Sequence, residues 1–225
     1  MSLKGRECIV TGGAGALGSA VAKALIGVGA KVMAIDHAQL PAEQPGIGNV
    51  DLSDPAKATA AIDKAVAEMG GLYALINIAG TFKWETVQDG SVATWDMLYS
   101  VNLKTAVSAS KAALPHLLKK KSGRIVNIGA GAAAKAAKGM GAYAASKAGV
   151  ARLTEALSEE VKNDGITVNA ILPSTIDTTA NRKDMPDADF AKWVKPEQIA
   201  ALIAFLLSDD ASAITGASIP ISGRV

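Results

Sequence analysis

Cysteine, histidine and aromatic residues are scarce in this chain of 225 residues, which has one cysteine, two histidines and 4% aromatic residues. A single cysteine, Cys8, cannot build a disulfide framework, and it favours a reducing compartment. His37 and His116 have no second ligand candidate beside them, so no metal site is predicted. Few aromatic residues within a hydrophobic content of 49% predict an aliphatic core.

Long apolar runs and blocks of one charge are also missing. The longest late apolar run, 200–207, is too short to span a bilayer, and no apolar stretch before Gly12 could serve as a secretory signal. The net charge of +2 comes from interspersed charges, which leaves no basic face for nucleic acid. We therefore expect one domain over residues 1–225, located in the cytoplasm, with no membrane or nucleic-acid partner.

Short apolar runs alternate with segments of helical periodicity along the whole chain. We expect strands at 7–11, 31–35, 49–52, 73–78, 124–128, 166–172 and 218–221. We expect helices at 20–28, 56–69, 94–118, 143–161 and 196–207, with Pro115 kinking or shortening one of them and 37–48 forming a loop. This alternation predicts an α/β fold: a single-domain, doubly wound parallel sheet of the Rossmann type, with about seven strands and helices on both faces.

A glycine-rich run separates the first expected strand from the first helix. In Gly12-Gly13-Ala14-Gly15-Ala16-Leu17-Gly18, small residues allow a pyrophosphate to approach the backbone closely. The amides and dipole at the start of the helix favour its negative charge. A plain tight turn is the alternative, but the position between strand and helix favours nucleotide binding.

Two acidic residues follow later strands. Asp36 ends the second strand, where a carboxylate can accept hydrogen bonds from a ribose 2′-hydroxyl and repels a 2′-phosphate, so NAD is predicted over NADP. Asp51, followed by Leu52, could meet an adenine amino group. The alternative for Asp36 is a carboxylate that only caps a turn.

Tyr143 and Lys147 are four residues apart on an expected helix, so their side chains share one face. A nearby ammonium favours phenolate and is one of the few ways to lower the pKa of a phenol. The pair alone could equally be a packed ring and a solvated lysine. The rest of the chain decides between these interpretations.

Taken together, these motifs make the chain resemble the short-chain dehydrogenase/reductase family from end to end. The motifs are Thr11-Gly12 with Gly15 and Gly18, Asp36, Asn77-Ile78-Ala79-Gly80, Asn102, Tyr143-Ala144-Ala145-Ser146-Lys147, and 173–178. The resemblance implies a nicotinamide cofactor, a small-molecule substrate and a homodimer or homotetramer.

The resemblance also implies roles for individual residues. Tyr143 is implied as the proton donor or acceptor, Lys147 as the residue that lowers its pKa and holds the nicotinamide ribose, and Asn102 as the support of a water relay. The implied cofactor-binding residues are Gly12, Gly15, Ala16, Leu17, Gly18, Asp36, Asp51, Leu52, Asn77, Ala79, Gly80, Tyr143, Lys147, Pro173, Ile176 and Thr178.

Three positions depart from the family pattern. Ala16 replaces the middle glycine, Asn77-Ile78 replaces a pair of asparagines, and Ala130 stands where the family has a catalytic serine. That serine hydrogen-bonds the reacting oxygen, so its absence argues against ordinary alcohol or ketone chemistry.

One subgroup, dihydropteridine reductase, looks similar in these same respects. The similarity covers the glycine run, the alanine at position 130, the short second crossover, and the stretch 177–193. It implies an NADH-dependent reductase acting on a quinonoid dihydropterin. Trp84 or Trp193 could stack on such a flat ring; the alternative is that both are loop anchors in the core. The alternatives are a dehydrogenase of small alcohols or ketones and a nucleotide-binding regulator without turnover.

Overall fold

Seven parallel strands form one sheet in the order β3-β2-β1-β4-β5-β6-β7. The computed structural model describes residues 2–225. The strands are β1 (Glu7–Thr11), β2 (Lys31–Ile35), β3 (Gly46–Ile47), β4 (Ala74–Asn77), β5 (Gly123–Ile128), β6 (Ile166–Pro173) and β7 (Ser218–Ile221). The predicted doubly wound α/β fold is therefore confirmed.

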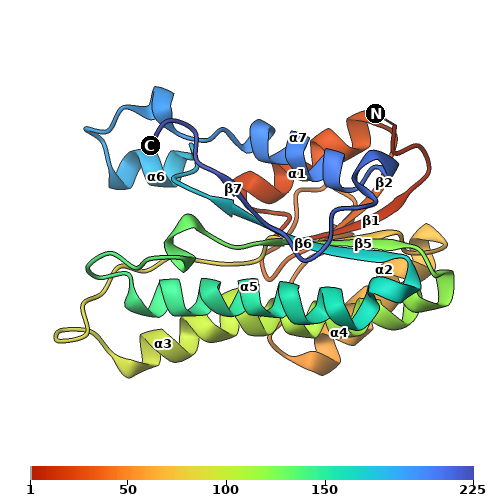
Figure 1. Ribbon diagram of the computed structural model, residues 1–225, viewed down its shortest axis with the longest axis horizontal. Helices are drawn as coiled ribbons and strands as arrows, with labels where there is room; N and C mark the ends of the chain where they lie inside the picture. Colours follow the sequence, from red (N-terminus) through yellow and green to blue (C-terminus); the bar gives the residue numbers. More distant parts are fainter. Residues whose placement is uncertain (1) are drawn as a thin grey trace.

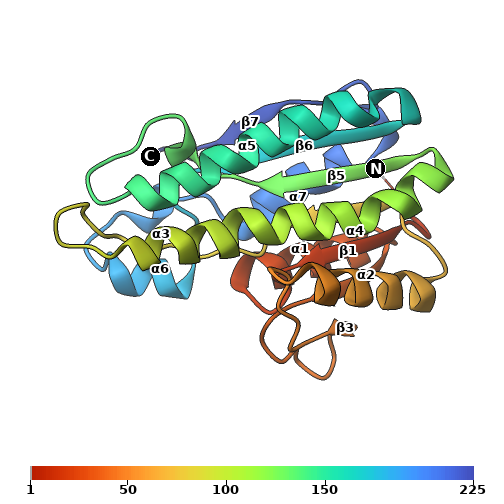
Figure 2. The same ribbon diagram turned by 90° about the horizontal axis from the view of Figure 1, so that it is seen from below.

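Helices cover both faces of the sheet (Figures 1 and 2). On one face lie α1 (Ala16–Gly27) and α7 (Pro196–Leu206), and on the other α2 (Pro55–Met69), α4 (Thr105–Lys120) and α5 (Gly141–Val161). Two shorter helices, α3 (Val92–Tyr99) and α6 (Thr179–Asp184), complete the fold. Each face has its own aliphatic core, because every strand except the outer two is buried along nearly its whole length.

The expected third strand at 49–52 is wrong. The strand β3 lies earlier, at Gly46–Ile47, inside the segment expected to be a loop. A Cβ atom on Gly46 would lie 2.2 Å from the carbonyl oxygen of Ala34, so only glycine allows this strand to approach β2. The glycines that indicated a loop are thus what permits the pairing.

The single long helix expected at 94–118 is interrupted. Its residues form α3, a π-helical turn at Ser100–Lys104, and α4, which continues through Pro115 to Lys120. Pro115 does not shorten the helix, because it and Lys111, four residues earlier, are both exposed and water can satisfy the freed carbonyl. The π-helical turn carries Asn102.

Two other boundaries differ from expectation. Helix α1 begins at Ala16 rather than Ala20, so its first turn belongs to the glycine-rich run. Helix α6 was not expected, because its six residues are too few to show a periodicity. It begins where the Thr178 hydroxyl accepts a hydrogen bond from the amide of Asn181.

Candidate functional site

The glycine-rich run forms a close-packed loop at the carboxyl end of β1. A Cβ atom on Gly18 would lie 2.0 Å from the carbonyl oxygen of Gly12, and one on Gly12 would lie 2.8 Å from the amide nitrogen of Ala79. Gly15 is the N-cap of α1 and has no side chain to satisfy the first amides of the helix. These amides leave a place for an anionic group, which fits a dinucleotide pyrophosphate.

Asp36 holds this loop from the neighbouring strand. Its carboxylate is 5% exposed and accepts hydrogen bonds from the amides of Ala14 and Ala38, each at 2.9 Å, while the His37 ring lies 3.0 Å from Oδ1. Because a carboxylate has about four lone-pair positions, Oδ2 keeps acceptor capacity for a further donor. The residue is thus placed beside the predicted phosphate loop and can take a ribose hydroxyl.

Asn77-Ile78-Ala79-Gly80 continues β4 alongside the glycine loop. The hydroxyl of Thr11 accepts hydrogen bonds from the amides of Ile78 and Ala79 at 3.1 and 3.2 Å. Asn77 itself points into the sheet and donates to Ser110 and Asn127. The segment therefore runs along the loop, while the Asn77 side chain joins strands and helix beneath it.

Tyr143, Lys147, Asn102 and Gly80 converge at the carboxyl edge of the sheet. A Cβ atom on Gly80 would lie 2.9 Å from Oδ1 of Asn102 and 3.2 Å from Nζ of Lys147, so a side chain there would fill the space between them. The Lys147 ammonium is buried and donates to the carbonyl of Ile128 at 2.8 Å. Tyr143 lies one turn earlier on α5, with its ring against the edge of Phe82 at 4.9 Å between centroids.

The lowering of the Tyr143 pKa that the resemblance implies for Lys147 stays a prediction. Burial raises the pKa of Tyr143 to about 12, and burial lowers the pKa of Lys147 to about 8. No hydrogen bond joins the two side chains among residues 2–225, since the ammonium turns to Ile128. Burial is the cause of both shifts.

Asn102 is buried, whereas a lone asparagine on a helix is usually exposed. Its Oδ1 accepts from the amide of Thr81 at 2.7 Å, and its Nδ2 donates to the Thr81 carbonyl and to the Ser146 hydroxyl, both at 3.0 Å. Ser146 in turn donates to the carbonyl of Tyr143 at 2.7 Å. Asn102 therefore connects the segment after β4 to the helix that carries Tyr143.

The segments after β5 and β6 lie side by side at the same edge. A Cβ atom on Gly129 would meet the Leu172 side chain at 2.4 Å, and one on Gly131 would lie 3.5 Å from the carbonyl of Pro173. Ala130 between them is buried and brings no hydroxyl group. Ser146, the serine within the motif 143–147, accepts a hydrogen bond from Asn102 and donates one to the Tyr143 carbonyl.

The remaining predicted cofactor residues lie around this edge with fewer mutual contacts. Ile176 pairs with Val194 in an isolated bridge, and the Thr178 hydroxyl caps α6. Asp51 is exposed and binds Ser53, while Leu52 belongs to the core below α2. The structure thus brings the glycine run, Gly80, Asn102 and Lys147 together, but it gives Asp51 and Thr178 local roles.

Sequence reasoning missed several residues that shape the site. Ser146 and Thr81 complete the Asn102 network, and Gln44 donates to the carbonyl of Gly13 at 2.9 Å from the segment expected to be a plain loop. Ser146 lies inside the Tyr143 motif, so its helical spacing from Tyr143 could have indicated it. Nothing in the pattern around Gln44 indicates its partner.

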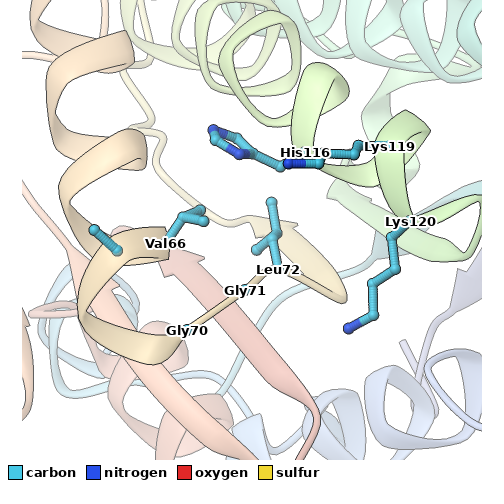
Figure 3. A pocket seen from close by; sticks show the side chains of 8 residues that line it. Val66, Gly70, Gly71, Leu72, His116, Lys119 and Lys120 are labelled. Carbon is cyan, nitrogen blue, oxygen red and sulfur yellow. The ribbon is translucent and has the colours of Figure 1, made fainter.

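One cavity lies far from this edge. It has a volume of about 580 Å³ and lies where α2 and α4 end, next to the start of β4 (Figure 3). Its lining residues are Val66, Ala67, Gly70, Gly71, Leu72, His116, Lys119 and Lys120. Because the predicted site residues follow the carboxyl ends of the strands, this cavity is at the opposite end of the sheet.

Residues 2–225 lack two further features, a membrane-spanning helix and a metal-binding cluster. None of the helices in this range is long and apolar enough to cross a membrane. The same residues contain no group of three or more histidine, cysteine, aspartate or glutamate side chains placed to hold a metal ion.

The comparisons with known proteins agree with this geometry. Residues 6–189 match the family model described as short chain dehydrogenase. A relative from Xanthobacter autotrophicus, 2-(S)-hydroxypropyl-CoM dehydrogenase 3, is 34% identical over 98% of this chain and 96% of its own length. The chain therefore belongs to the short-chain dehydrogenase/reductase family, whose members use NAD or NADP.

Further similar proteins cover nearly the whole chain. The 4-formylbenzenesulfonate dehydrogenase of Comamonas testosteroni is 31% identical over 99% of this chain and 98% of its own. The ligand-free structure of Thermoplasma acidophilum aldohexose dehydrogenase has a TM-score of 0.90 at 28% identity and covers 99% of this chain and 94% of that one. The chain is thus similar to oxidoreductases in sequence and in fold.

Proposed function

We propose that this chain is an NAD(H)-dependent oxidoreductase in which Tyr143 exchanges a proton with a small substrate. The observation that carries the proposal is the convergence of Gly80, Asn102 and Lys147 next to Tyr143, at the edge where the glycine loop lies. We propose further that residues 1–225 work as one domain, in the cytoplasm. The predicted oligomer, a homodimer or homotetramer, belongs to the same proposal.

The proposed reaction divides the work between cofactor and protein. The nicotinamide supplies or removes a hydride when it is bound. During reduction the Tyr143 hydroxyl gives its proton to the substrate atom that becomes negative, and during oxidation it takes a proton back. Its raised pKa, about 12, keeps the phenol protonated at neutral pH but also makes it a weak acid, so donation depends on stabilisation of the phenolate that forms.

Lys147 and Asn102 have different parts in this proposal. The Lys147 ammonium, with a pKa of about 8, carries a positive charge in most molecules at pH 7, which stabilises a phenolate as it forms. Both Nδ2 hydrogens of Asn102 are used within the protein. We therefore assign the Asn102 side chain to positioning Thr81 and the Tyr143 helix, rather than to direct contact with substrate.

The nature of the acceptor follows from Ala130. An isolated carbonyl develops negative charge on one oxygen, and loss of one positioned donor to such an oxygen costs on the order of 10²–10³ in rate. A quinonoid dihydropterin spreads the charge over several atoms, so Tyr143 alone can suffice. This favours a conjugated ring as acceptor, and of the two tryptophans that the sequence suggested for stacking, Trp193 is buried and Trp84 is exposed.

A second candidate is a small carbonyl compound or alcohol. The names of the similar proteins include a hydroxypropyl group, a formyl group and, in the reductases from Salmonella typhimurium and Escherichia coli, a 3-oxoacyl group. These names favour carbonyl chemistry at this site as well. The third possibility, a regulator that binds the cofactor without turnover, is motivated only by Ala130.

One assay separates the three possibilities. NADH oxidation is measured with quinonoid dihydropterin and with a panel of aldehydes and ketones, for the wild type, Tyr143→Phe and the exposed control Tyr99→Phe. We expect Tyr143→Phe to lower kcat by about 10²-fold or more, and Tyr99→Phe to have no effect. Fast turnover of a ketone, with none of the pterin, would reject the pterin; cofactor binding without any turnover would identify a regulator.

A further inference from the structure

Five of the nine aromatic residues of this chain are Tyr143 and four residues of one short stretch of sequence. Only nine residues are phenylalanine, tryptophan or tyrosine. Five of them are Phe82, Trp84, Trp95 and Tyr99, which fall within 18 residues of sequence, and Tyr143 itself. In a chain with an otherwise aliphatic core, this grouping next to the proposed proton donor needs an explanation.

Phe82 and Trp84 contact the start of the Tyr143 helix from the same side of their segment. The Phe82 ring meets the Tyr143 ring edge to face at an interplanar angle of 87°. A Cβ atom on Gly139 would lie 2.1, 2.3 and 2.6 Å from three atoms of the five-membered ring of Trp84. All three atoms belong to one ring, so a face of the indole lies over the Gly139 backbone.

The segment that carries these two rings is fixed in place. Asn102 holds both the amide and the carbonyl of Thr81, and the amide of Glu85 donates to the Gly139 carbonyl at 2.8 Å. The side chain between the rings, Lys83, turns toward Thr94 and Glu85. In an extended segment, alternate side chains lie on the same face. Phe82 and Trp84 therefore share the face opposite Lys83, and both rings face the Tyr143 helix.

Both rings are nevertheless largely exposed. Phe82 is 52% exposed and Trp84 is 55% exposed, whereas Trp193 is 6% exposed and packs against Phe190. One face of the Trp84 indole rests on Gly139, so its exposed area lies mainly on the other face. A large aromatic ring held rigidly with one face open is suited to stacking on a flat ligand.

We propose that Trp84, with Phe82 beside it, forms a platform that selects substrates carrying a flat aromatic or conjugated ring next to the reacting atom. This inference rests on the proposed function of Tyr143, because the platform is defined by its contacts with the Tyr143 helix. It names the substrate class by shape and not by a particular compound. Substrates with puckered or purely aliphatic groups lose the stacking contact and bind less well.

The binding test uses ligands that cannot react, so it does not depend on turnover. The NADH-loaded protein is titrated by calorimetry with naphthalene-2-carboxamide and with its saturated analogue, decahydronaphthalene-2-carboxamide. We expect the wild type to bind the flat amide about five- to tenfold more tightly than the puckered one. In Trp84→Leu this preference should disappear, and in Phe82→Leu it should weaken.

The matched control is Phe205→Leu, since Phe205 is 37% exposed and lies on α7, in the opposite helical layer. It should keep the wild-type preference. Equal binding of the two amides by the wild type, or a preference that survives Trp84→Leu, overturns the platform. A Trp84→Leu variant with an altered sedimentation coefficient and an unchanged preference also overturns it, because Trp84 would then belong to a subunit interface.

A kinetic arm separates the platform from the proposed function. The corresponding naphthalene and decahydronaphthalene aldehydes are assayed by NADH oxidation, and the ratio of their kcat/KM values is compared between wild type and Trp84→Leu, so that intrinsic reactivity cancels. The ratio should fall about five- to tenfold in the variant. Loss of all turnover, with quinonoid dihydropterin as well as with the aldehydes, and with an intact binding preference, would reject the oxidoreductase proposal and retain the platform.

Discussion

At the scale of single residues, the predicted preference for NADH over NADPH rests on the Asp36 carboxylate. Because Asp36 is buried and held by the amides of Ala14 and Ala38, it cannot turn away from a 2′-phosphate. We expect NADH to bind at least about tenfold more tightly than NADPH, a difference of about 1.4 kcal/mol. Fluorescence titration with both cofactors measures the ratio.

Two variants make the Asp36 prediction specific. Asp36→Ala should narrow the gap between the cofactors, mainly by improving NADPH binding. Asp210→Ala removes an exposed carboxylate from another part of the chain and should leave the ratio unchanged. Equal affinities of the wild-type protein for NADH and NADPH would contradict the prediction.

Lys147 makes the stability of the protein depend on pH. Its pKa falls from 10.5 to about 8 on folding, because burial disfavours the ammonium. Between these two values the unfolded chain binds more protons than the folded one, so the free energy of unfolding rises with pH. Below pH 8 the folded protein bears the whole free-energy cost of burying the Lys147 ammonium. This cost decreases above pH 8 and disappears as the pH approaches 10.5.

The variant Lys147→Met removes this dependence while keeping an unbranched side chain. Urea unfolding at pH 7 and pH 10 should show that the stability advantage of the variant over the wild type shrinks with pH, by an amount on the order of 3 kcal/mol. Lys111→Met, at an exposed position of α4, should show no such change. A constant difference between variant and wild type across this range would show that the Lys147 pKa is not lowered.

At the scale of elements, the π-helical turn at Ser100–Lys104 carries Asn102, whose side chain links the segment after β4 to the Tyr143 helix. It breaks the regular helix at Asn102, and π-helical turns are frequent at functional sites. Asn102→Ala would leave the Thr81 amide and carbonyl and the Ser146 hydroxyl without this partner. We expect the free energy of unfolding to fall by about 1–3 kcal/mol.

The same variant should affect catalysis through position. Because Asn102 holds the segment before Phe82, its loss should lower kcat and weaken the flat-ring preference without changing cofactor choice. Asn163→Ala, at an exposed position after α5, serves as the control for both measurements. If Asn102→Ala has the same free energy of unfolding in urea as the wild type, the Asn102 hydrogen bonds make no net contribution to stability.

The sequence predicted the elements well where periodicity or a motif defined them, and it failed where a single close contact decides. The seven-strand sheet and the glycine loop follow from alternating apolar runs and from Gly12 to Gly18. The strand β3 was misplaced because only the approach of Gly46 to Ala34 distinguishes it from a loop. The balance between burial and charge at Tyr143 likewise depends on packing that spacing cannot reveal.

At the scale of the whole molecule, the two helical layers differ in what they leave exposed. Along α3 and α4, the exposed apolar side chains include Trp95, Met97, Tyr99 and Val107. On α5, Leu157 belongs to the core, while Ala148 and Leu153 are half-buried. Exposed apolar side chains grouped on one layer are typical of a surface that another subunit covers.

We therefore expect the protein to sediment as a dimer or tetramer at micromolar concentration, with the α3, α4 and α5 layer between subunits. Val107→Asp places a charge in this surface and should shift the equilibrium toward the monomer, because burying an unpaired carboxylate is costly. Ile26→Asp changes a similarly exposed apolar residue on α1, in the opposite layer, and should leave the sedimentation coefficient unchanged. A wild-type protein that is monomeric throughout this range, or a shift caused by Ile26→Asp alone, would place the interface elsewhere or remove it.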